Sequence, residues 1–418
     1  MTLKKITAFS LLLLLLFPLT SLKPIPNYGS DFLEFWTDVH DNYAYFDKKH
    51  CDWDKVKTVY LPLAEKAHTE NELITLMEQA LEELYDNHFS LNTNLKSSTR
   101  LAPTGLDLWA EWVDGKAVVT EVRKGFSADK VGIRCGMEIS SINGIPVEEA
   151  VKKRIGKCIT NTDTEVKNYA LRQLLAGTYL QERVLGVKQG DKTNTVNLDK
   201  AAGNLTDKQQ HATLLDSRIL DQNIGYIRVN NSLGETDLIP LFDKALEQLR
   251  NTTALVIDLR DTPSGGNSIV ARGIMSRFIQ TEMPYQKHVL PNEEKLSGIK
   301  RSWLELVSPR GPFTYVKPVV ILVDHWTGSM GEGITVGFDA LGRATTVGTR
   351  MAGLNGAING FSTTQAKIPY SFPTEQLYHI NGTAREQYTP TKLVDLNNTS
   401  YNGMDDPILT EGLKAIKH

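Results

Sequence analysis

The chain has 418 residues, of which 41% are hydrophobic and 23% charged, a composition typical of a soluble globular protein with two or three domains. Its formal net charge of -3 argues against nucleic acid as a partner, because phosphate binding favours a basic surface. Neither Cys-x-x-Cys nor His-Glu-x-x-His occurs, so the sequence predicts no metal site, and nothing in it indicates a cofactor. Three cysteines are too few for a disulfide framework. One bridge, Cys135 to Cys158 by proximity, can form after export, and three buried thiols are an equal alternative.

The N-terminus has the pattern of a secretory signal. Lys4 and Lys5 precede a leucine run, residues 11–16, which is too short for a comfortable membrane span. We therefore assign residues 1–22 to a signal peptide and expect an exported protein, periplasmic or secreted. The cleavage site lacks a clear pair of small residues, so an uncleaved N-terminal anchor stays an alternative. No other segment is apolar enough to cross a bilayer.

Residues 28–98 are predicted to form an N-terminal helical region, because apolar residues recur at spacings of three and four. His88 lies where this helical spacing gives way to strand-like alternation, among Asp, Asn and Ser residues. A histidine in such a place is commonly a hydrogen-bonded structural residue. Polar neighbours that fix its tautomer would also allow it to act as a base. The amphipathic helices are expected within residues 31–39, 53–60 and 72–84.

Residues 102–198 consist of short strands separated by glycines and resemble a PDZ domain. Three features carry the resemblance: a valine-rich strand at Lys116–Val122, a short helix within 125–139, and the Ile142–Gly144 turn. Met137 departs from the pattern, since such domains usually carry Asp after the glycine. The resemblance implies capture of a peptide end by strand addition to a sheet edge. A β-rich spacer with a degenerate groove is the alternative.

A polar linker is expected within residues 199–222, and residues 205–418 are assigned to the largest domain. Strands alternate with helices there, which predicts parallel pairing and an α/β core. The expected strands are 223–229, 254–260 and 318–323, and the expected helices are 238–249, 269–279 and 334–341.

Ser329 lies between an apolar strand and a helix, with glycines on both sides. Such a turn exposes a side-chain oxygen and places backbone N–H groups and the positive end of a helix beside it. These are the requirements of a serine nucleophile with an oxyanion site. For an isolated Gly-Ser-x-Gly, however, a helix N-cap is the commoner explanation. Glu332, three residues further on, is placed to cap the helix start.

Four segments together resemble the C-terminal processing (tail-specific) and tricorn-core serine protease family: Asp258–Arg260, Pro263–Gly266, Thr327–Ser329 and Gly342–Thr349. The resemblance implies a multidomain α/β and α+β protein, in which a helical region and a PDZ-like domain precede a crotonase/ClpP-like α/β protease core. It also implies that Ser329 is the nucleophile. Backbone N–H groups of Gly265, Gly266 and Met330 would form the oxyanion hole.

The general base departs from the tail-specific pattern, because Leu354 stands at the position of that branch's catalytic lysine. The tricorn-like branch instead takes a histidine from the N-terminal region and a glutamate from near the C-terminus. By this resemblance His88 is the base and Glu386 orients its ring, with His379 as a competing base. Ser329, His88 and Glu386 would then form a relay.

These inferences predict an exported serine endopeptidase that cleaves peptides or the tails of unfolded proteins. The alternative is a catalytically inactive protease-like protein that binds peptides, for which Leu354 is the motive. A crotonase-like acyl-transfer enzyme is a further alternative, but no coenzyme A pocket is recognisable. The sequence does not predict the oligomeric state.

Overall fold

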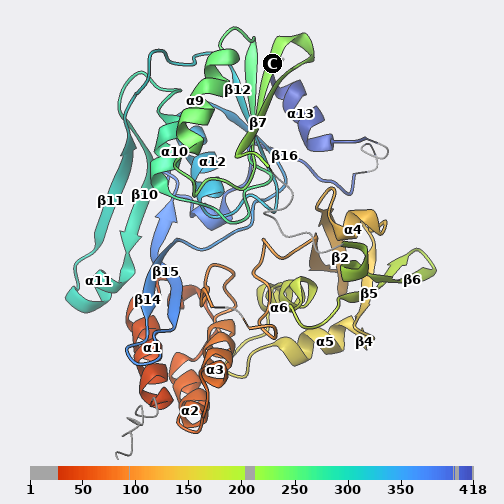
Figure 1. Cartoon of the computed structure of the whole chain (residues 1–418), viewed down its shortest axis with the longest axis vertical. Helices are drawn as coiled ribbons and strands as arrows, with labels where there is room; N and C mark the ends of the chain where they lie inside the picture. The colour runs from red at the N-terminus through yellow and green to blue at the C-terminus, as the bar shows by residue number, and fades with distance from the viewer. Residues whose placement is uncertain (1–26, 94, 203–211, 399, 401–403, 417–418) are drawn as a thin grey trace, which may run out of the picture.

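The computed structural model describes residues 27–93, 95–202, 212–398, 400 and 404–416. The predicted signal peptide, residues 1–22, lies outside this part of the chain. Within the described residues the strands form three sheets (Figure 1). No helix in these ranges is both long enough and apolar enough to span a membrane.

In the described ranges the helices, with 3₁₀ helices labelled η, are α1 (Tyr28–Asn42), η1 (Phe46–Lys48), α2 (Trp53–Ala64), α3 (Glu70–Glu82), α4 (Ser127–Lys130), α5 (Val147–Arg154), α6 (Thr164–Ala176), α7 (Leu198–Ala202), η2 (Asp221–Asn223), α9 (Leu238–Gln248), α10 (Ser268–Met275), α11 (Pro291–Ser297), α12 (Met330–Ala340), η3 (Arg385–Gln387) and α13 (Pro407–Ile416). The strands are β1 (Leu108–Val113), β2 (Lys116–Val122), β3 (Glu138–Ile142), β4 (Ile145–Pro146), β5 (Val184–Gln189), β6 (Lys192–Asn197), β7 (Leu215–Leu220), β8 (Ile224–Val229), β9 (Ala254–Asp258), β10 (Met283–Leu290), β11 (Arg301–Val307), β12 (Val319–Val323), β13 (Thr345–Gly348), β14 (Ala357–Ser362), β15 (Pro369–Tyr378) and β16 (Lys392–Leu393).

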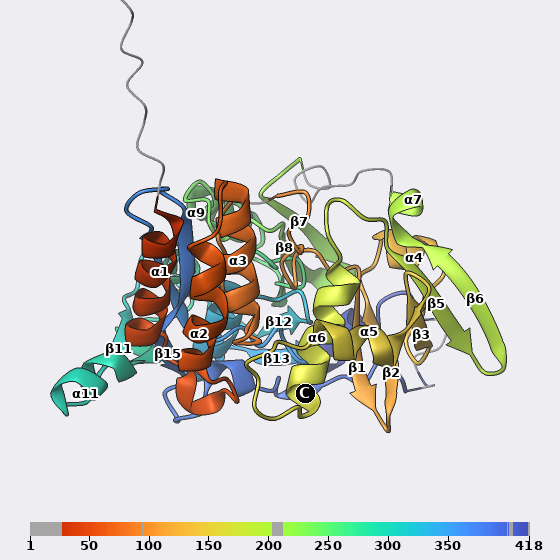
Figure 2. The same cartoon turned by 90° about the horizontal axis from the view of Figure 1, so that it is seen from below.

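Helices α1, α2 and α3 pack together at one end of the molecule (Figures 1 and 2). Each begins at a polar N-cap, Asn27, Asp52 or Thr69, whose side chain accepts a backbone N–H of the first turn. Their buried aromatic faces share one core with Tyr370 and Phe372 of β15. The segment carrying His88 therefore leaves a helical bundle that is anchored to the C-terminal half of the chain.

A second part is the sheet with strand order β1-β2-β3-β5-β6, against which α5 and α6 pack. All its pairings are antiparallel. Alternate residues of β2 are buried, as expected for a sheet with one covered face. The PDZ-like character of this part stays a prediction.

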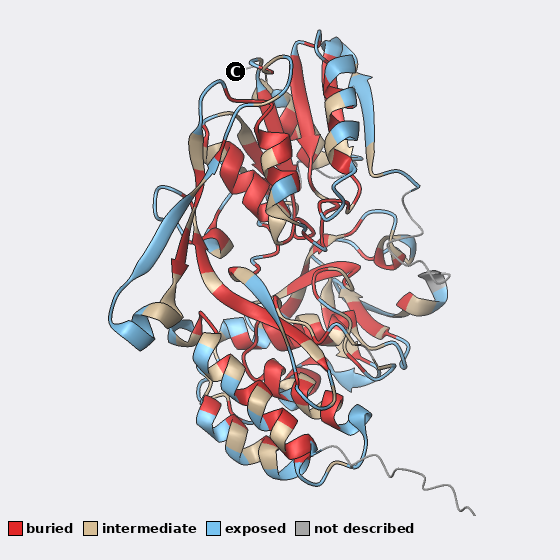
Figure 3. Ribbon diagram, turned by 60° about the vertical axis from the view of Figure 1, so that its left-hand side comes forward, coloured by how far each residue is buried: buried red, intermediate tan, exposed pale blue. Residues whose placement is uncertain are grey.

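The central sheet has the order β16-β13-β12-β9-β8-β7, parallel except for the edge strand β7. Both faces are covered, which explains why β9 and β12 are apolar at every position except Asp258. Leu255 and Ile257 face a core shared with α9, α10 and α12, whereas Val256 faces α13. Figure 3 shows the buried residues concentrated in the strands at the centre. The predicted parallel α/β core is confirmed.

A third sheet, β11-β10-β15-β14, was not assigned from the sequence. Its longest strand, β15, is buried at most positions and so lacks the alternation that marks a strand. The hairpin β10-α11-β11 extends away from the body of the molecule (Figure 1). Strand β15 joins this sheet to the helical bundle, so it connects the region of His88 with the central core.

The fold class is confirmed as a mixed α/β and α+β arrangement of helices and several sheets. The domain boundaries inferred from the sequence stay predictions. All three cysteines are free thiols, so the Cys135 to Cys158 bridge is not formed in this structure.

Candidate active site

Ser329 stands at the turn between β12 and α12, where the parallel sheet ends. Its backbone has φ +49° and ψ -107°, a conformation that residues other than glycine rarely adopt. Such strain occurs mainly at functional sites. The side chain lines a cleft of about 950 Å³. The segment after the helical bundle, the part with the β1-β2-β3-β5-β6 sheet, and the turns after the central strands all contribute to its walls. The predicted strand, tight turn and helix are confirmed, and they present the hydroxyl at a cavity.

His88 lies beside Ser329 although 241 positions separate them in the chain. Its Nε2 is 3.0 Å from Ser329 Oγ, and its Nδ1 is 2.5 Å from the carbonyl oxygen of Asn355. A carbonyl can only accept, so Nδ1 carries the ring proton. The unprotonated Nε2 therefore accepts a hydrogen bond from the Ser329 hydroxyl. This is the tautomer that a general base requires.

The surroundings of His88 keep its ring neutral. Burial, followed by the positive charge of Arg385, lowers its pKa to about 4, although the bond to Asn355 opposes both effects. At neutral pH almost every molecule thus has an imidazole able to take a proton.

Asp86 fixes the segment that carries His88. Its buried carboxylate accepts hydrogen bonds from the Tyr43 hydroxyl at 2.7 Å, the Asn355 side-chain amide at 2.8 Å and the His88 backbone N–H at 2.9 Å. Burial, followed by the charge of Asp86, raises the pKa of Tyr43 well above its usual range. Three distant segments therefore meet at one carboxylate. The same asparagine provides the carbonyl that holds the His88 ring.

The glycine turn after β9 lies directly against Ser329. A Cβ on Gly265 would be 2.5 Å from Ser329 Cβ, and φ at this glycine is +66°. The N–H of Gly265 donates to the Thr262 carbonyl at 3.1 Å, so it is not available to a substrate. In the described part of the chain, no group accepts a hydrogen bond from the N–H of Gly266 or Met330. Of the three predicted oxyanion donors, these two remain candidates.

Glu386 does not reach the ring of His88 in this structure. Its Oε1 accepts a hydrogen bond from Lys48 Nζ at 2.9 Å, and the Asn355 carbonyl occupies the position beside Nδ1 that the resemblance gave to Glu386. Glu386 lies instead on a second cavity of about 400 Å³, together with Asn355 and Arg385. Direct orientation of the ring by this glutamate is therefore replaced by a main-chain contact.

The competing base, His379, also lies away from Ser329. Its Nε2 is 3.3 Å from Asp339 Oδ2, and its Nδ1 accepts the backbone N–H of Asn381. The ring stacks on Tyr388. Its contacts are those of a structural histidine.

Leu354 is buried and lines the cleft beside the nucleophile turn. One of its methyl groups is 3.3 Å from the position that a Cβ on Gly328 would take. An apolar wall thus occupies the place where the tail-specific branch has its lysine. No proton acceptor is offered from this side.

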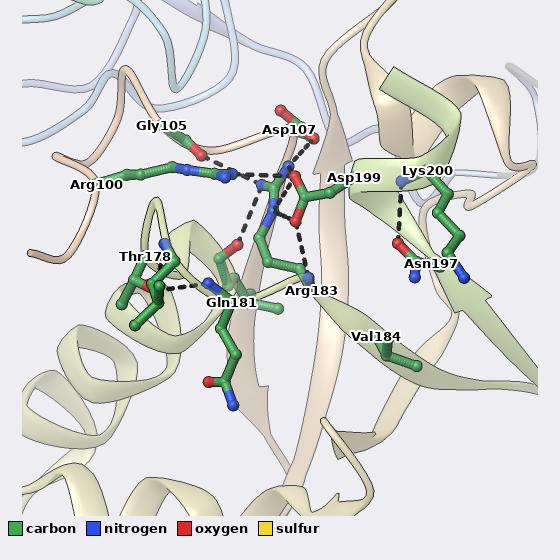
Figure 4. A network of polar contacts seen from close by, with 12 residues as sticks. Arg100, Gly105, Asp107, Thr178, Gln181, Arg183, Val184, Asn197, Asp199 and Lys200 are labelled. Carbon is green, nitrogen blue, oxygen red and sulfur yellow. Dashed lines mark hydrogen bonds and ion pairs between the residues drawn. The ribbon is translucent and has the colours of Figure 1, made fainter. Parts of the chain in front are cut away.

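The far wall of the cleft is a network of charged residues (Figure 4). Arg183 is almost completely buried, and its guanidinium bonds Asp199, Asp107 and two main-chain carbonyls. Arg100 reaches the same Asp199 at 3.2 Å. Because two arginines share two carboxylates, this wall is rigid and close to electrically neutral.

The edge of β1 that a PDZ-like groove would offer to a peptide is partly occupied. The backbone N–H of Trp112 donates to the side chain of Asn168, on α6, at 2.8 Å. Arg172 of the same helix lies over the ring of Trp109 at 4.7 Å. Strand addition at this edge requires α6 to move.

Comparisons with known proteins give the class to which the chain is similar. Residues 223–392 match the model of peptidase family S41, and residues 26–82 match that of the tricorn protease C1 domain. The chain is similar in structure to mature CPAF, with a TM-score of 0.59 and 15% identity over 94% of this chain and 96% of that one. It is similar to the photosystem II D1 C-terminal processing protease, with a TM-score of 0.56 and 17% identity over 93% of this chain and 97% of that one. Among curated proteins none matches.

At these identities the structural likenesses show the fold, and the family matches add the class of protein. The chain is a serine peptidase. The match to peptidase family S41 covers the C-terminal part of the chain, and the match to the tricorn protease C1 domain precedes it.

Sequence reasoning missed the groups that hold the pair together. The carbonyl of Asn355 orients His88, and a main-chain carbonyl has no signature in a sequence. Asp86 was recognised only as a polar neighbour of His88. Its charge and its place two residues before the histidine were the available signal.

Proposed function

We propose that the chain is an exported serine endopeptidase that cleaves peptides or protein tails through an acyl-enzyme at Ser329, with His88 as general base. The observation that carries this proposal is the 3.0 Å approach of His88 Nε2 to Ser329 Oγ, in the tautomer that accepts a proton. Both groups line the same cleft of about 950 Å³.

In the first step Ser329 Oγ attacks the carbonyl carbon of the scissile peptide, and its proton moves to His88 Nε2. The negative charge that develops on the carbonyl oxygen is stabilised by the N–H groups of Gly266 and Met330 and by the N-terminus of α12. Collapse of this intermediate breaks the C–N bond, and Nε2 returns its proton to the departing amine.

In the second step a water molecule attacks the acyl-enzyme while Nε2 again takes a proton. Oγ leaves and recovers that proton, which regenerates the hydroxyl. Throughout the cycle the Asn355 carbonyl holds the ring through Nδ1–H. When the ring becomes an imidazolium, the carboxylate of Asp86 lies near enough to raise its proton affinity.

Glu386 has a more distant role in this proposal. Its carboxylate lies on the cavity behind Asn355, and Lys48 partly neutralises it. We assign it an electrostatic contribution to the imidazolium, transmitted across that cavity rather than through a direct hydrogen bond.

Export and tail recognition are supported by separate observations. The signal-like pattern of residues 1–22 supports export. One structural relative is a C-terminal processing protease, which supports a protein tail as substrate. The PDZ-like part would present such a tail once α6 moves from the β1 edge.

The alternative function is a peptide-binding protein without catalysis. Leu354 favours it, because the lysine base of the tail-specific branch is missing. The aligned Ser329 and His88 pair and the two free N–H groups favour catalysis, since binding alone needs none of them.

Peptide cleavage tests the two functions. The full chain is incubated with unfolded proteins and with synthetic peptides, and products are identified by mass spectrometry. We expect new termini in the presence of the wild-type protein and none with Ser329→Ala. Retention of peptides without cleavage, equal in both proteins, would establish the binding function instead.

A further inference from the structure

Glu332 is completely buried at the start of α12, close to both members of the catalytic pair. Its Oε2 accepts the backbone N–H of Ser329 at 2.8 Å, and its Oε1 accepts that of Gly353 at 2.9 Å. The N–H of Leu354 lies 3.3 Å from both oxygens. One carboxylate therefore serves three main-chain donors from two segments.

These two segments carry the two halves of the chemistry. The first bond fixes the backbone of Ser329 in its strained conformation. The other bonds fix the residues directly before Asn355, whose carbonyl holds the His88 ring. A movement of either segment would change the distance between Oγ and Nε2.

We infer that Glu332 is a positioning residue: its ionised carboxylate ties the turn of the nucleophile to the loop that orients the base. This inference rests on the proposed function. It goes beyond a helix cap, because a cap would satisfy the α12 terminus without holding the loop of Asn355.

Only the ionised form fits this set of donors. A protonated carboxyl carries its hydrogen on one of the two oxygens, and each oxygen here faces an N–H group. Protonation thus points the carboxyl hydrogen at a backbone N–H group. The segment that carries this N–H loses its hydrogen bond and is held less firmly. A displacement of the reacting groups by about 1 Å can lower the rate roughly a hundredfold.

The charges around Glu332 come from several elements. The positive charge of Arg385, on η3, acts on Glu332, and its guanidinium bonds the carbonyls of Leu354 and Gly356. His88 faces it across the Ser329 turn. The other titratable groups on the adjoining cavity are Asp86, Glu111, Glu165, Glu386, Lys48, Lys49, Arg172, Arg350, His325, Tyr45, Tyr85 and Tyr388.

Burial raises the pKa of Glu332 to about 7, although Arg385 and the three N–H groups lower it. The pKa of His88 is about 4. Reaction at Ser329 needs both groups unprotonated. The rate therefore falls on the acid side of the pH profile (the acid limb), and the pH of this fall depends on which of the two groups controls it. If Glu332 positions the pair, activity falls as pH drops through about 7, well before the ring of His88 is protonated.

The experiment measures the rate at which a serine-reactive phosphonate phosphonylates Ser329 between pH 5 and 9. Wild-type protein should lose activity below pH 7. Glu332→Gln has the same shape but cannot ionise, and its amide opposes one of the N–H groups. It should be about a hundredfold slower at pH 8 and should show no change between pH 5.5 and 8.

The matched control is Glu83→Gln. Glu83 is also completely buried and accepts two backbone N–H groups, those of Lys157 and Cys158, but it lies outside both cavities. This variant should keep the acid limb of the wild type. Glu332→Asp, which can still ionise, should keep an acid limb at a reduced rate.

A wild-type rate that does not fall between pH 8 and pH 5, or an unchanged loss of rate at low pH in Glu332→Gln, would overturn the inference. If Glu332→Gln does not fold, the inference is tested by the pH at which the rates of the wild type and of Glu332→Asp fall. Failure of wild-type protein to react with the phosphonate at any pH would instead refute the proposed function.

Discussion

Replacement of Gly266 by alanine tests the oxyanion hole through geometry alone. A Cβ at this position would lie 2.1 Å from the carbonyl carbon and oxygen of Leu233. Main-chain atoms cannot yield as a flexible side chain does, so the turn itself must shift by about 1 Å to reach a normal contact distance. The neighbouring hydrogen bond from Asn267 N–H to the Leu233 carbonyl would be strained as well.

This shift removes the Gly266 N–H from the developing oxyanion. Loss of one such donor typically lowers kcat by about 10²–10³, which corresponds to about 2.7–4 kcal/mol of transition-state stabilisation. We expect a loss of this size in Gly266→Ala, mainly in kcat. Substrate binding along the cleft does not depend on this N–H group.

The assay is steady-state hydrolysis of a fluorogenic peptide, combined with urea unfolding to verify the fold. Gly234→Ala is the matched control, because Gly234 follows Leu233 in the chain, is exposed, and an added Cβ meets nothing within 4 Å. It should retain wild-type kcat. A Gly266→Ala protein that is folded and as active as the control would refute the assignment.

Three further predictions concern the base and its support. His88→Ala should slow acylation by about 10²–10⁴, whereas His379→Ala should act like the wild type in the same phosphonate assay. Asp86→Asn leaves at least one of the three buried donors facing the amide N–H groups and should lower the free energy of unfolding by roughly 1–3 kcal/mol in urea titrations; an unchanged midpoint would contradict this. Because burial lowers the pKa of His88 from 6.5 to about 4, the neutral ring supports folding above pH 6.5, and that support, about 3 kcal/mol, is lost as pH falls towards 4. His88→Gln should therefore lose less free energy of unfolding than the wild type between pH 7.5 and 4.5. Glu332, whose pKa is raised, instead adds stability as the pH falls, and it does so equally in both proteins.

The sequence predicted best what depends on local pattern. The apolar run of β12, the glycine turn and the helix α12 follow from burial and backbone freedom, so Ser329 was placed correctly at a strand end. The parallel core followed in the same way from alternating strands and helices. His88 could be proposed as its partner only through a family resemblance, because no local pattern reports a contact across 241 positions.

What the sequence did not predict depends on tertiary contacts. Glu386 was expected beside the ring, but Lys48 from the N-terminal region binds it and a main-chain carbonyl takes its place. Glu332 was interpreted as a helix cap, since its bonds to Gly353 and Leu354 arise only when β13 pairs beside β12. Strand β15, buried along most of its length, had no periodicity to reveal it.

Mapping the covalent adduct shows directly which side chain is the nucleophile. The full chain is treated with a phosphonylating serine probe, digested, and analysed by mass spectrometry. We expect one adduct, on Ser329, which is absent from Ser329→Ala and forms far more slowly in His88→Ala. An adduct on another residue, or equal labelling in His88→Ala, would contradict it.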